Sequence, residues 1–147
     1  MHLTRFTDNA LRCLMLLGLE PERCVPVPEV ATRMNMSYDH LVKIVQRLTA
    51  VGYVETERGR HGGVRLAMRP ADINIGTLVR HTEDNLILVE CFNTDHQECP
   101  IASACKLAGV LEQALAAFFN VLDGRSLEDV LRPKRELIRL TTRLTAS

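Results

Sequence analysis

The sequence predicts a mainly α-helical protein with a small β-hairpin wing. We expect a winged helix-turn-helix domain, then a cysteine-bearing loop and a long dimerisation helix. Three observations lead to this prediction. Residues 28–51 hold two short amphipathic segments with a turn between them, and residues 53–68 contain two strand-like runs around a Gly-rich turn. Residues 91–105 carry three of the five cysteines, directly before a long apolar segment. We assign the DNA-binding domain to residues 1–72 and the second unit to residues 73–147.

Composition limits the class of protein. With 147 residues, of which 46% are hydrophobic and 24% charged, the chain is typical of a globular protein. It has no Trp and only six other aromatic residues, which argues against a stacking surface for single-stranded nucleic acid. We find neither a signal peptide nor an apolar run of about 18 residues, so we expect a cytoplasmic protein without a membrane span. Nucleotide-binding loops and catalytic-triad patterns are not found, and we expect no enzyme activity.

Three helices are expected in the first domain. The first covers residues 7–19, with Thr7 or Asp8 as its N-cap, and a short second helix lies near residues 28–34. A third helix lies within residues 37–52, where apolar residues recur at i, i+3, i+4 and i+7. Its buried stripe consists of Leu41, Ile44, Val45 and Leu48. The outer face then presents the polar and basic residues Ser37, Tyr38, His40, Lys43 and Arg47.

A basic hairpin follows this helix pair. Residues 53–58 and 64–68 form its expected strands around the sequence GRHGG, which makes the hairpin a candidate wing. Residues that could reach phosphates or a minor groove are Arg58, Arg60, His61 and Arg65. Residues 33–69 hold seven Lys/Arg against three acids, although the whole chain is neutral. A solvated hairpin without a partner is the alternative, but the helix pair and wing together favour binding to double-stranded DNA.

The second unit contains a long helix, expected at about residues 102–123. One apolar stripe consists of Leu107, Leu111, Ala114, Phe118 and Leu122, and a second of Val110, Ala117 and Val121. A helix that is apolar on two sides must bury both, so we expect one side to pack on its own domain and the other on a homodimer partner. A two-fold dimer would place two recognition helices on a palindromic operator.

Shorter elements flank this helix. Asn74 is the expected N-cap of a helix with the sequence IGTLVRHTE, and Ser126 with Asp129 is expected to cap a short helix, SLEDVL. The basic tail from residue 133 predicts no element.

Cys91, Cys99 and Cys105 form the candidate metal site. Their odd number argues against simple disulfide pairing, and three interpretations remain open. The grouping is accidental, or it binds zinc with a fourth ligand such as His96, or it binds an iron–sulfur cluster. Zinc sites usually include close C-x2-4-C pairs, which this segment lacks. An iron–sulfur cluster tolerates wide gaps, and three thiolates leave one iron of a 4Fe–4S cluster for another ligand. If a cluster is bound, we expect 4Fe–4S rather than 2Fe–2S.

The position of the cysteines supports a role in binding an anionic group. Pro100 suits a first helical turn, so Cys99 is expected near the free N–H groups at the start of the long helix. Such groups stabilise thiolates and other anions. By contrast, Cys13 and Cys24 stand alone and are expected to be small buried hydrophobic residues.

Five segments together resemble the Rrf2 family of winged-helix repressors, over roughly residues 1–132. They are LTRFTDNALR, ERGRHGGVRL, INIGTLVRHTE, LVEC with CPIASAC, and AFFNVLDGRSLEDVL. The resemblance implies a homodimer whose long helix crosses the two-fold axis, with an iron–sulfur cluster as its cofactor. The wing departs slightly from the family's common RGRGGG or RGKNGG, at His61.

The resemblance also implies a ligand set. In the nitric-oxide-sensing branch of the family, a first-helix carboxylate of the partner subunit is the fourth cluster ligand. The matching residue here is Asp8, and Arg12, one turn later, is placed to hold it. Another branch uses a histidine at the position of Ala108, which disfavours that ligand set. The seven-residue gap between Cys91 and Cys99 resembles an iron-responsive branch. We therefore expect a nitric oxide sensor, with an iron- or cluster-status regulator as the alternative, and a zinc-stapled DNA-binding module or a redox protein as rivals from other classes.

Overall fold

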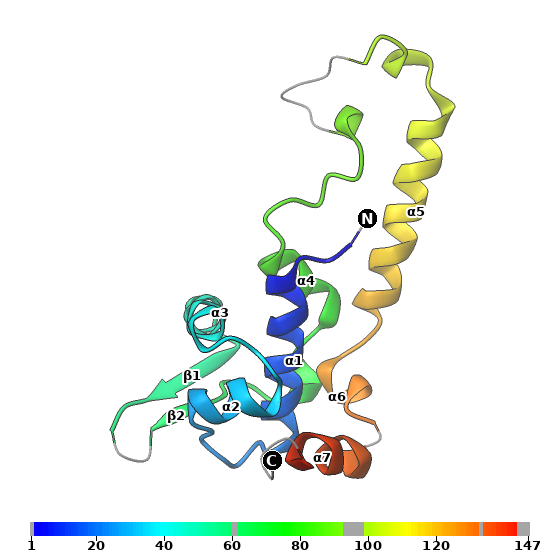
Figure 1. Cartoon of the computed structure of the whole chain (residues 1–147). Helices are drawn as coiled ribbons and strands as arrows, with labels where there is room; N and C mark the ends of the chain where they lie inside the picture. Colours follow the sequence, from blue (N-terminus) through cyan, green and yellow to red (C-terminus); the bar gives the residue numbers. More distant parts are fainter. Residues whose placement is uncertain (1, 60–61, 93–98, 133, 144–147) are drawn as a thin grey trace.

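A computed structural model describes residues 2–59, 62–92, 99–132 and 134–143. A winged-helix body occupies one end, and a long helix extends away from it toward the cysteine segment at the other end (Figure 1). The elements of the body are α1 (Arg5–Leu19), α2 (Val27–Arg33), α3 (Tyr38–Val51), β1 (Val54–Glu57), β2 (Gly63–Leu66) and α4 (Ile75–Thr82). They are followed by α5 (Lys106–Asp123), α6 (Leu127–Val130) and α7 (Lys134–Arg143). Mainly helical structure with one hairpin confirms the predicted fold class.

Helix α1 is the centre of the core. It contacts α3, α4, α6 and α7, so it is buried on most sides, with Leu14, Leu16 and Leu17 almost fully enclosed. The helix begins earlier than predicted, because the Thr4 side chain accepts a hydrogen bond from the Thr7 backbone N–H and is the N-cap. The prediction that Thr7 or Asp8 caps this helix is therefore wrong.

Helices α2 and α3 form the predicted helix-turn-helix. The turn between them places Asn35 at a positive φ of 51°, and the Met36 N–H donates to the Ala31 carbonyl oxygen at 2.8 Å. As predicted, Ser37 directly precedes α3 and Gly52 directly follows it, with a φ of 88° that is the left-handed conformation of a helix C-cap.

The wing is shorter than predicted. Strands β1 and β2 pair antiparallel from Val54 opposite Leu66 to Glu57 opposite Gly63, four residues each. The hairpin is tied to the body by two further hydrogen bonds of 2.9 Å between the backbones of Val25 and Val64. A Cβ on Gly63 would lie 2.3 Å from the Val25 carbonyl oxygen, so this approach requires glycine.

The capping predictions for α4 and α6 are confirmed. The Asn74 side chain accepts from the Thr77 N–H at 2.9 Å, and Ser126 with Asp129 forms a reciprocal capping box. Backbone hydrogen bonds between residues 73–75 and 125–127 then join the two caps. Helix α4 is thereby fixed to the end of α5.

The start of α5 and the C-terminal tail differ from the prediction. Residues 102–104 form a 3-10 turn, and α5 starts only at Lys106 with Cys105 as its N-cap. Cys105, rather than Cys99, therefore lies at the helix N-terminus. The tail forms α7, which packs against α1 and covers part of the core with Leu137.

Helix α5 buries little of its apolar surface within one chain. Phe119 is its only buried residue, with Phe118 and Leu122 half-buried beside it. Leu107, Val110 and Val121 are 62%, 59% and 66% exposed. The exposed stripe of α5 consists of Leu107, Val110, Ala114, Ala117 and Val121. The predicted division into two stripes is thus partly wrong, since Leu107 and Ala114 belong to the exposed side.

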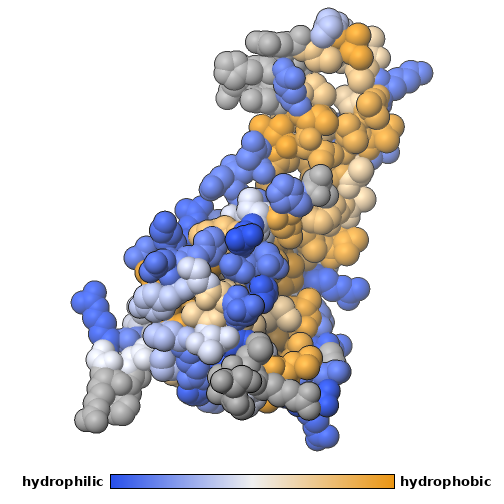
Figure 2. Space-filling model, in the orientation of Figure 1, coloured by the Kyte–Doolittle hydropathy of each residue, from blue (hydrophilic) through white to orange (hydrophobic). Residues whose placement is uncertain are grey.

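Figure 2 shows this apolar surface running along α5 above the more polar winged-helix body. Within the described ranges, no helix combines the length and apolar character needed to cross a bilayer.

Candidate functional site

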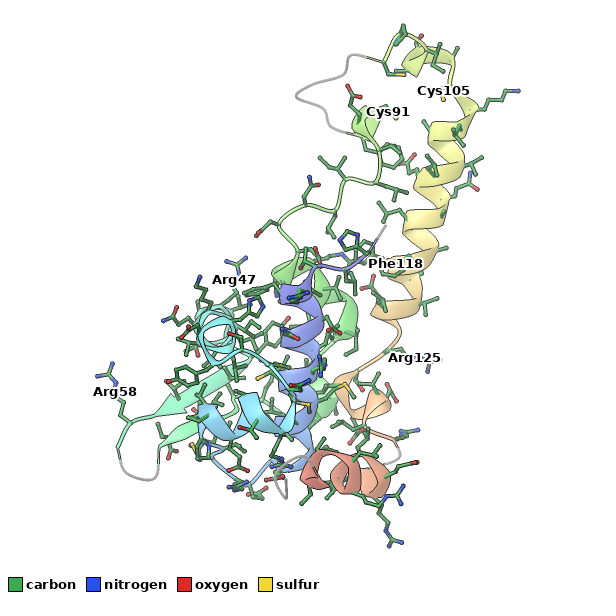
Figure 3. The ribbon with its side chains drawn as sticks, in the orientation of Figure 1. Arg47, Arg58, Cys91, Cys105, Phe118 and Arg125 are labelled. Atoms are coloured by element: carbon green, nitrogen blue, oxygen red, sulfur yellow. The ribbon has the colours of Figure 1, made fainter. Side chains whose placement is uncertain are left out.

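The predicted recognition surface is exposed at the N-terminal half of α3. Ser37, Tyr38 and Lys43 are all exposed, and Tyr38 retains half of its accessible area. Arg58 projects from the hairpin beyond the end of β1 (Figure 3). Arg60 and His61, the other predicted residues of the wing tip, lie outside the described residues.

His40 does not belong to the outer face as predicted. It is half-buried, and its ring packs edge-on against Phe6 of α1 with 6.0 Å between the ring centroids. Its Nε2 atom is buried and has no hydrogen-bond partner among the described residues. The side chain turns inward because α1 offers an aromatic ring beside the first turn of α3.

Arg47 and Arg65 are already engaged by other groups of the chain. The Arg47 guanidinium donates from Nε and Nη2 to the His81 carbonyl oxygen, at 3.2 and 3.0 Å, so it points toward α4 (Figure 3). Arg65 is paired with Glu55 at 2.6 Å and with Glu57 at 3.1 Å, and these carboxylates raise its pKa. Arg47 is exposed on the outer face of α3, as expected, although its guanidinium is engaged by α4. The DNA contacts of Arg47 and Arg65 stay predictions, and the ion pairs of Arg65 reduce its local positive charge.

The three candidate ligand cysteines are half-buried. Cys91 and Cys105 lie at the end of the molecule remote from the wing (Figure 3). Cys91 lies in the 3-10 turn Glu90–Phe92, while the Cys99 carbonyl oxygen accepts from the Ala102 N–H, and Cys105 caps α5. None of the described cysteines is part of a disulfide. No three candidate ligand side chains of the described residues are gathered into a metal site. His96, the possible zinc ligand, lies outside the described residues.

Asp8 and Arg12 form the predicted i, i+4 ion pair on α1. Arg12 Nη1 lies 3.6 Å from Asp8 Oδ2, and Nη2 donates to the Met34 carbonyl oxygen at 2.6 Å. Arg12 therefore ties α1 to the helix-turn-helix turn while leaving the Asp8 side chain 59% exposed. Both residues line an open cavity of about 410 Å³ between α1 and the start of α3.

Asp8 belongs to the winged-helix body, whereas the cysteine segment is carried at the far end of α5 (Figure 1). The single chain thus separates the carboxylate from the thiols.

Two residues at the end of α4 were missed by sequence reasoning. His81 contacts both α3 and the base of the wing, and Glu83 accepts hydrogen bonds from Thr4. Their partners are 28 to 79 residues away in the chain, so no local spacing marks them.

A helix-turn-helix with an exposed polar helix start and a tethered hairpin defines a winged-helix DNA-binding protein. Residues 3–133 match the Rrf2 family, which is described as an iron-dependent transcriptional regulator, and the chain belongs to this family. It is accordingly a DNA-binding transcriptional regulator and not an enzyme.

Several curated relatives extend over almost the whole chain. The HTH-type transcriptional regulator NsrR of Halalkalibacterium halodurans is 47% identical over 138 residues, which are 93% of this chain and 94% of that protein. NsrR of Bacillus subtilis is 44% identical over 141 residues, which are 95% and 97% of the two chains. Among solved structures, T. potens IscR has a TM-score of 0.73 at 23% identity and covers 90% of this chain and 88% of its own. CymR of B. subtilis has a TM-score of 0.72 at 24% identity, covering 88% and 95%. These two likenesses confirm the fold.

Proposed function

We propose that this regulator is a homodimeric repressor that holds a 4Fe–4S cluster and leaves its operator when nitric oxide reaches the cluster. The observation that carries the proposal is the exposed Asp8 carboxylate, held by Arg12 at the position that matches the cluster ligand of the nitric-oxide-sensing branch. The names of the relatives support the same branch, since several are called NsrR at 40 to 47% identity.

The ligand set of this proposal is Cys91, Cys99 and Cys105 of one subunit with Asp8 of the other. The donors fit an iron–sulfur cluster by their chemistry, because soft thiolates suit iron and none of these cysteines is consumed in a disulfide. Asp8 fits as a fourth ligand only from a second subunit, because its own cysteine segment lies at the other end of α5. The dimer completes the site.

The exposed stripe of α5 supports the dimer. It carries three large aliphatic side chains that are each more than half exposed, and a second copy of the same helix would cover them. In such a dimer, each cysteine segment is brought to the winged-helix body of the other subunit. The two recognition helices then read the half-sites of a palindrome.

When bound, the cluster would supply irons that nitric oxide attacks most easily at the carboxylate-ligated position, because oxygen is a poorer match than sulfur. The chain's own residues provide the response. While Asp8 and the cysteines are held together, the distance between the two wings is fixed. When these ligands separate, the cysteine segment is no longer tied to α1 of the other subunit and the wings lose the spacing of the operator. A release of about a hundredfold needs a difference of roughly 2.7 kcal/mol between the two states.

A regulator of iron or cluster status is the second candidate. The seven-residue gap between Cys91 and Cys99 favours it, and so does the description of the family as iron-dependent. In that case, the same ligands would respond to loss of iron rather than to nitric oxide.

The proposal is tested by purifying the protein without oxygen and measuring iron, acid-labile sulfide, zinc and the absorption spectrum. We expect a brown protein with about four irons per chain, whose visible bands change on addition of nitric oxide and persist in a low-iron chelator control. A colourless protein containing zinc would contradict the proposal. Bands that are lost to the chelator but do not change with nitric oxide would favour the second candidate.

The ligands are tested by Cys91→Ala, Cys99→Ala and Cys105→Ala, each of which should abolish the visible bands and derepress the target in cells. The matched control is Cys24→Ala, a half-buried cysteine of the winged-helix body, which should keep both the bands and repression.

A further inference from the structure

The C-terminal end of α4 is a junction between three parts of the winged-helix body. His81, in its last turn, contacts α3 through Arg47 and the base of the wing through Tyr53. Glu83, which follows the helix, contacts the N-cap of α1: its Oε1 accepts from the Thr4 N–H at 2.7 Å and from the Thr4 hydroxyl at 3.1 Å. The chain then continues from Glu83 to Cys91.

The contact with α3 is a two-point hydrogen bond. Carbonyl groups in the last turn of a helix have no partner within the helix, and the His81 carbonyl oxygen takes both of its partners from Arg47. The planar guanidinium gives this contact a fixed direction, which a lysine cannot reproduce. Arg47 is therefore oriented by α4.

The contact with the wing is made by the His81 ring. Tyr53 Oη lies 2.9 Å from His81 Nδ1, and the ring centroids are 5.8 Å apart. Burial raises the pKa of Tyr53, so its hydroxyl stays protonated and can donate to Nδ1. The Tyr53 carbonyl oxygen also accepts from the Ala67 N–H at 3.0 Å, directly beyond β2. His81 thus contacts both α3 and the wing, the two elements that would bind DNA.

The junction borders a hollow in the surface. An open cavity of about 240 Å³ lies between the end of α4 and α3, and it is lined by Phe6, Lys43, Arg47, Thr82 and Asp84.

We propose that His81, Arg47, Tyr53 and Glu83 transmit the position of the cysteine segment to α3 and the wing, with Arg47 acting as a positioning residue rather than a DNA contact. This inference rests on the proposed function for the signal, but the coupling itself belongs to the folded chain. A displacement of residues 83–91 would change the Glu83–Thr4 contact and the position of the last turn of α4. Because His81 contacts Arg47 and Tyr53, α3 and the wing would then move with α4.

The first test uses metal-free protein and needs no signal. Glu83→Ala should increase amide hydrogen exchange of residues 38–57, which include α3 and the base of the wing, by severalfold. The matched control is Glu22→Ala, an exposed acidic residue of the turn after α1 and outside the junction, which should leave that exchange unchanged. If Glu83→Ala changes exchange only in residues 2–8 and 76–92, the coupling is wrong.

The second test compares DNA affinity with and without the cluster. Arg47→Lys keeps the charge, and Tyr53→Phe removes a hydroxyl from a side chain that is 6% exposed. Both should reduce the ratio of cluster-loaded to stripped affinity about tenfold, with an unchanged salt dependence. Arg58→Gln, at the exposed wing, should instead weaken both forms and reduce the salt slope by about 1.8 per dimer, since one phosphate contact is lost from each subunit.

The outcomes separate the two proposals. If the affinity of the wild type for DNA does not depend on the cluster, the proposed function is wrong. The hydrogen-exchange experiment then decides by itself whether residue 83 is coupled to α3 and the wing. If the wild type responds but Arg47→Lys behaves as Arg58→Gln does, Arg47 is a DNA contact and the inference is overturned.

Discussion

Arg80 and Asp123 form a two-point ion pair that joins α4 to α5. The distances are 2.5 Å from Nη1 to Oδ1 and 2.9 Å from Nη2 to Oδ2, and the Arg80 guanidinium also lies 4.1 Å from the centre of the Phe119 ring. Each charge favours the ionised form of the other, so the pKa of Asp123 is lowered and that of Arg80 is raised. This contact sets the direction in which α5 leaves the body.

The first prediction concerns this ion pair. Asp123→Asn removes the charge and should loosen α5 on α4, which lowers the melting temperature and weakens operator binding by the dimer. Glu136→Gln is the matched control, because Glu136 belongs to an exposed 3.7 Å pair with Arg139 on α7 and should change neither property. Operator affinity equal to that of the wild type in Asp123→Asn would show that the direction of α5 does not control DNA binding.

The second prediction tests the close approach of the same helices. A Cβ on Gly76 would lie 1.9 Å from Asp123 Oδ1 and 3.0 Å from the Asp123 backbone nitrogen. Gly76→Ala should therefore separate α4 from α5 and lower the free energy of unfolding by about 1–3 kcal/mol, measured with urea. The control is Gly109→Ala in α5, where the added methyl meets no atom of the described chain within 4 Å. It should be neutral or stabilising by up to about 1 kcal/mol. Equal effects of the two substitutions would contradict the packing argument.

The third prediction concerns the dimer. Val110→Glu or Val121→Glu places a charge on the exposed stripe of α5 of both subunits. It should raise the dimer dissociation constant by about 10²- to 10⁴-fold, since two buried aliphatic side chains are lost per dimer and each contributes roughly 1.5–3 kcal/mol. Light scattering with size exclusion measures the loss of dimer. Ala116→Glu, also exposed but on the other side of the helix, should leave the dimer intact. Dimers that persist in both valine variants would place the interface elsewhere.

The fourth prediction concerns the pH dependence of stability. Cys13 is fully buried, and burial raises its pKa from 9.0 to about 12. Between these values the unfolded thiol ionises while the folded one keeps its proton, so the folded state loses stability as pH rises, by up to about 1.4 kcal/mol per pH unit. Urea unfolding between pH 8 and 10.5 should show this fall, and Cys13→Ala should flatten it. An identical slope in the variant would assign the pH dependence to other groups.

The fifth prediction concerns Asp8. Asp8→Ala keeps the three thiolates and should retain part of the cluster, but it should alter the rate at which nitric oxide changes the visible spectrum. Stopped-flow absorption measures this rate. Arg12→Gln, which removes the 3.6 Å ion pair but leaves the carboxylate, should give an intermediate effect. Unchanged kinetics in Asp8→Ala would remove this residue from the site.

Elements with local signals could be predicted from the sequence. Ser37 and Gly52 bound α3, and Asn74 and Ser126 cap their helices, because each signal is contained within about four residues. Helix α7 was missed because its stability depends on burying Leu137 against α1, a contact more than a hundred residues away in the chain. The start of α5 was misplaced because the apolar segment continues through a 3-10 turn.

The candidate site was predictable by residue type and less so by orientation. Ser37, Tyr38, Lys43 and Arg58 are exposed as expected. The spacing of apolar residues along the sequence is enough to predict which side chains face solvent. Arg47 is exposed as expected, but its contact with the His81 carbonyl could not be predicted, because that group belongs to a helix 34 residues later. His40 was misassigned because Phe6 draws its ring inward. The pair of Asp8 and Arg12 followed from i, i+4 spacing and is present.

The central claim is that joining the cysteines to Asp8 of the other subunit fixes the spacing of the two wings. The most direct measurement is operator affinity, determined anaerobically for cluster-loaded protein and for the same preparation stripped of metal. The probe is a palindromic duplex selected from random DNA by the loaded protein. We predict that stripping weakens binding about a hundredfold, which corresponds to roughly 2.7 kcal/mol. Equal affinity of the two forms for this duplex would contradict the account.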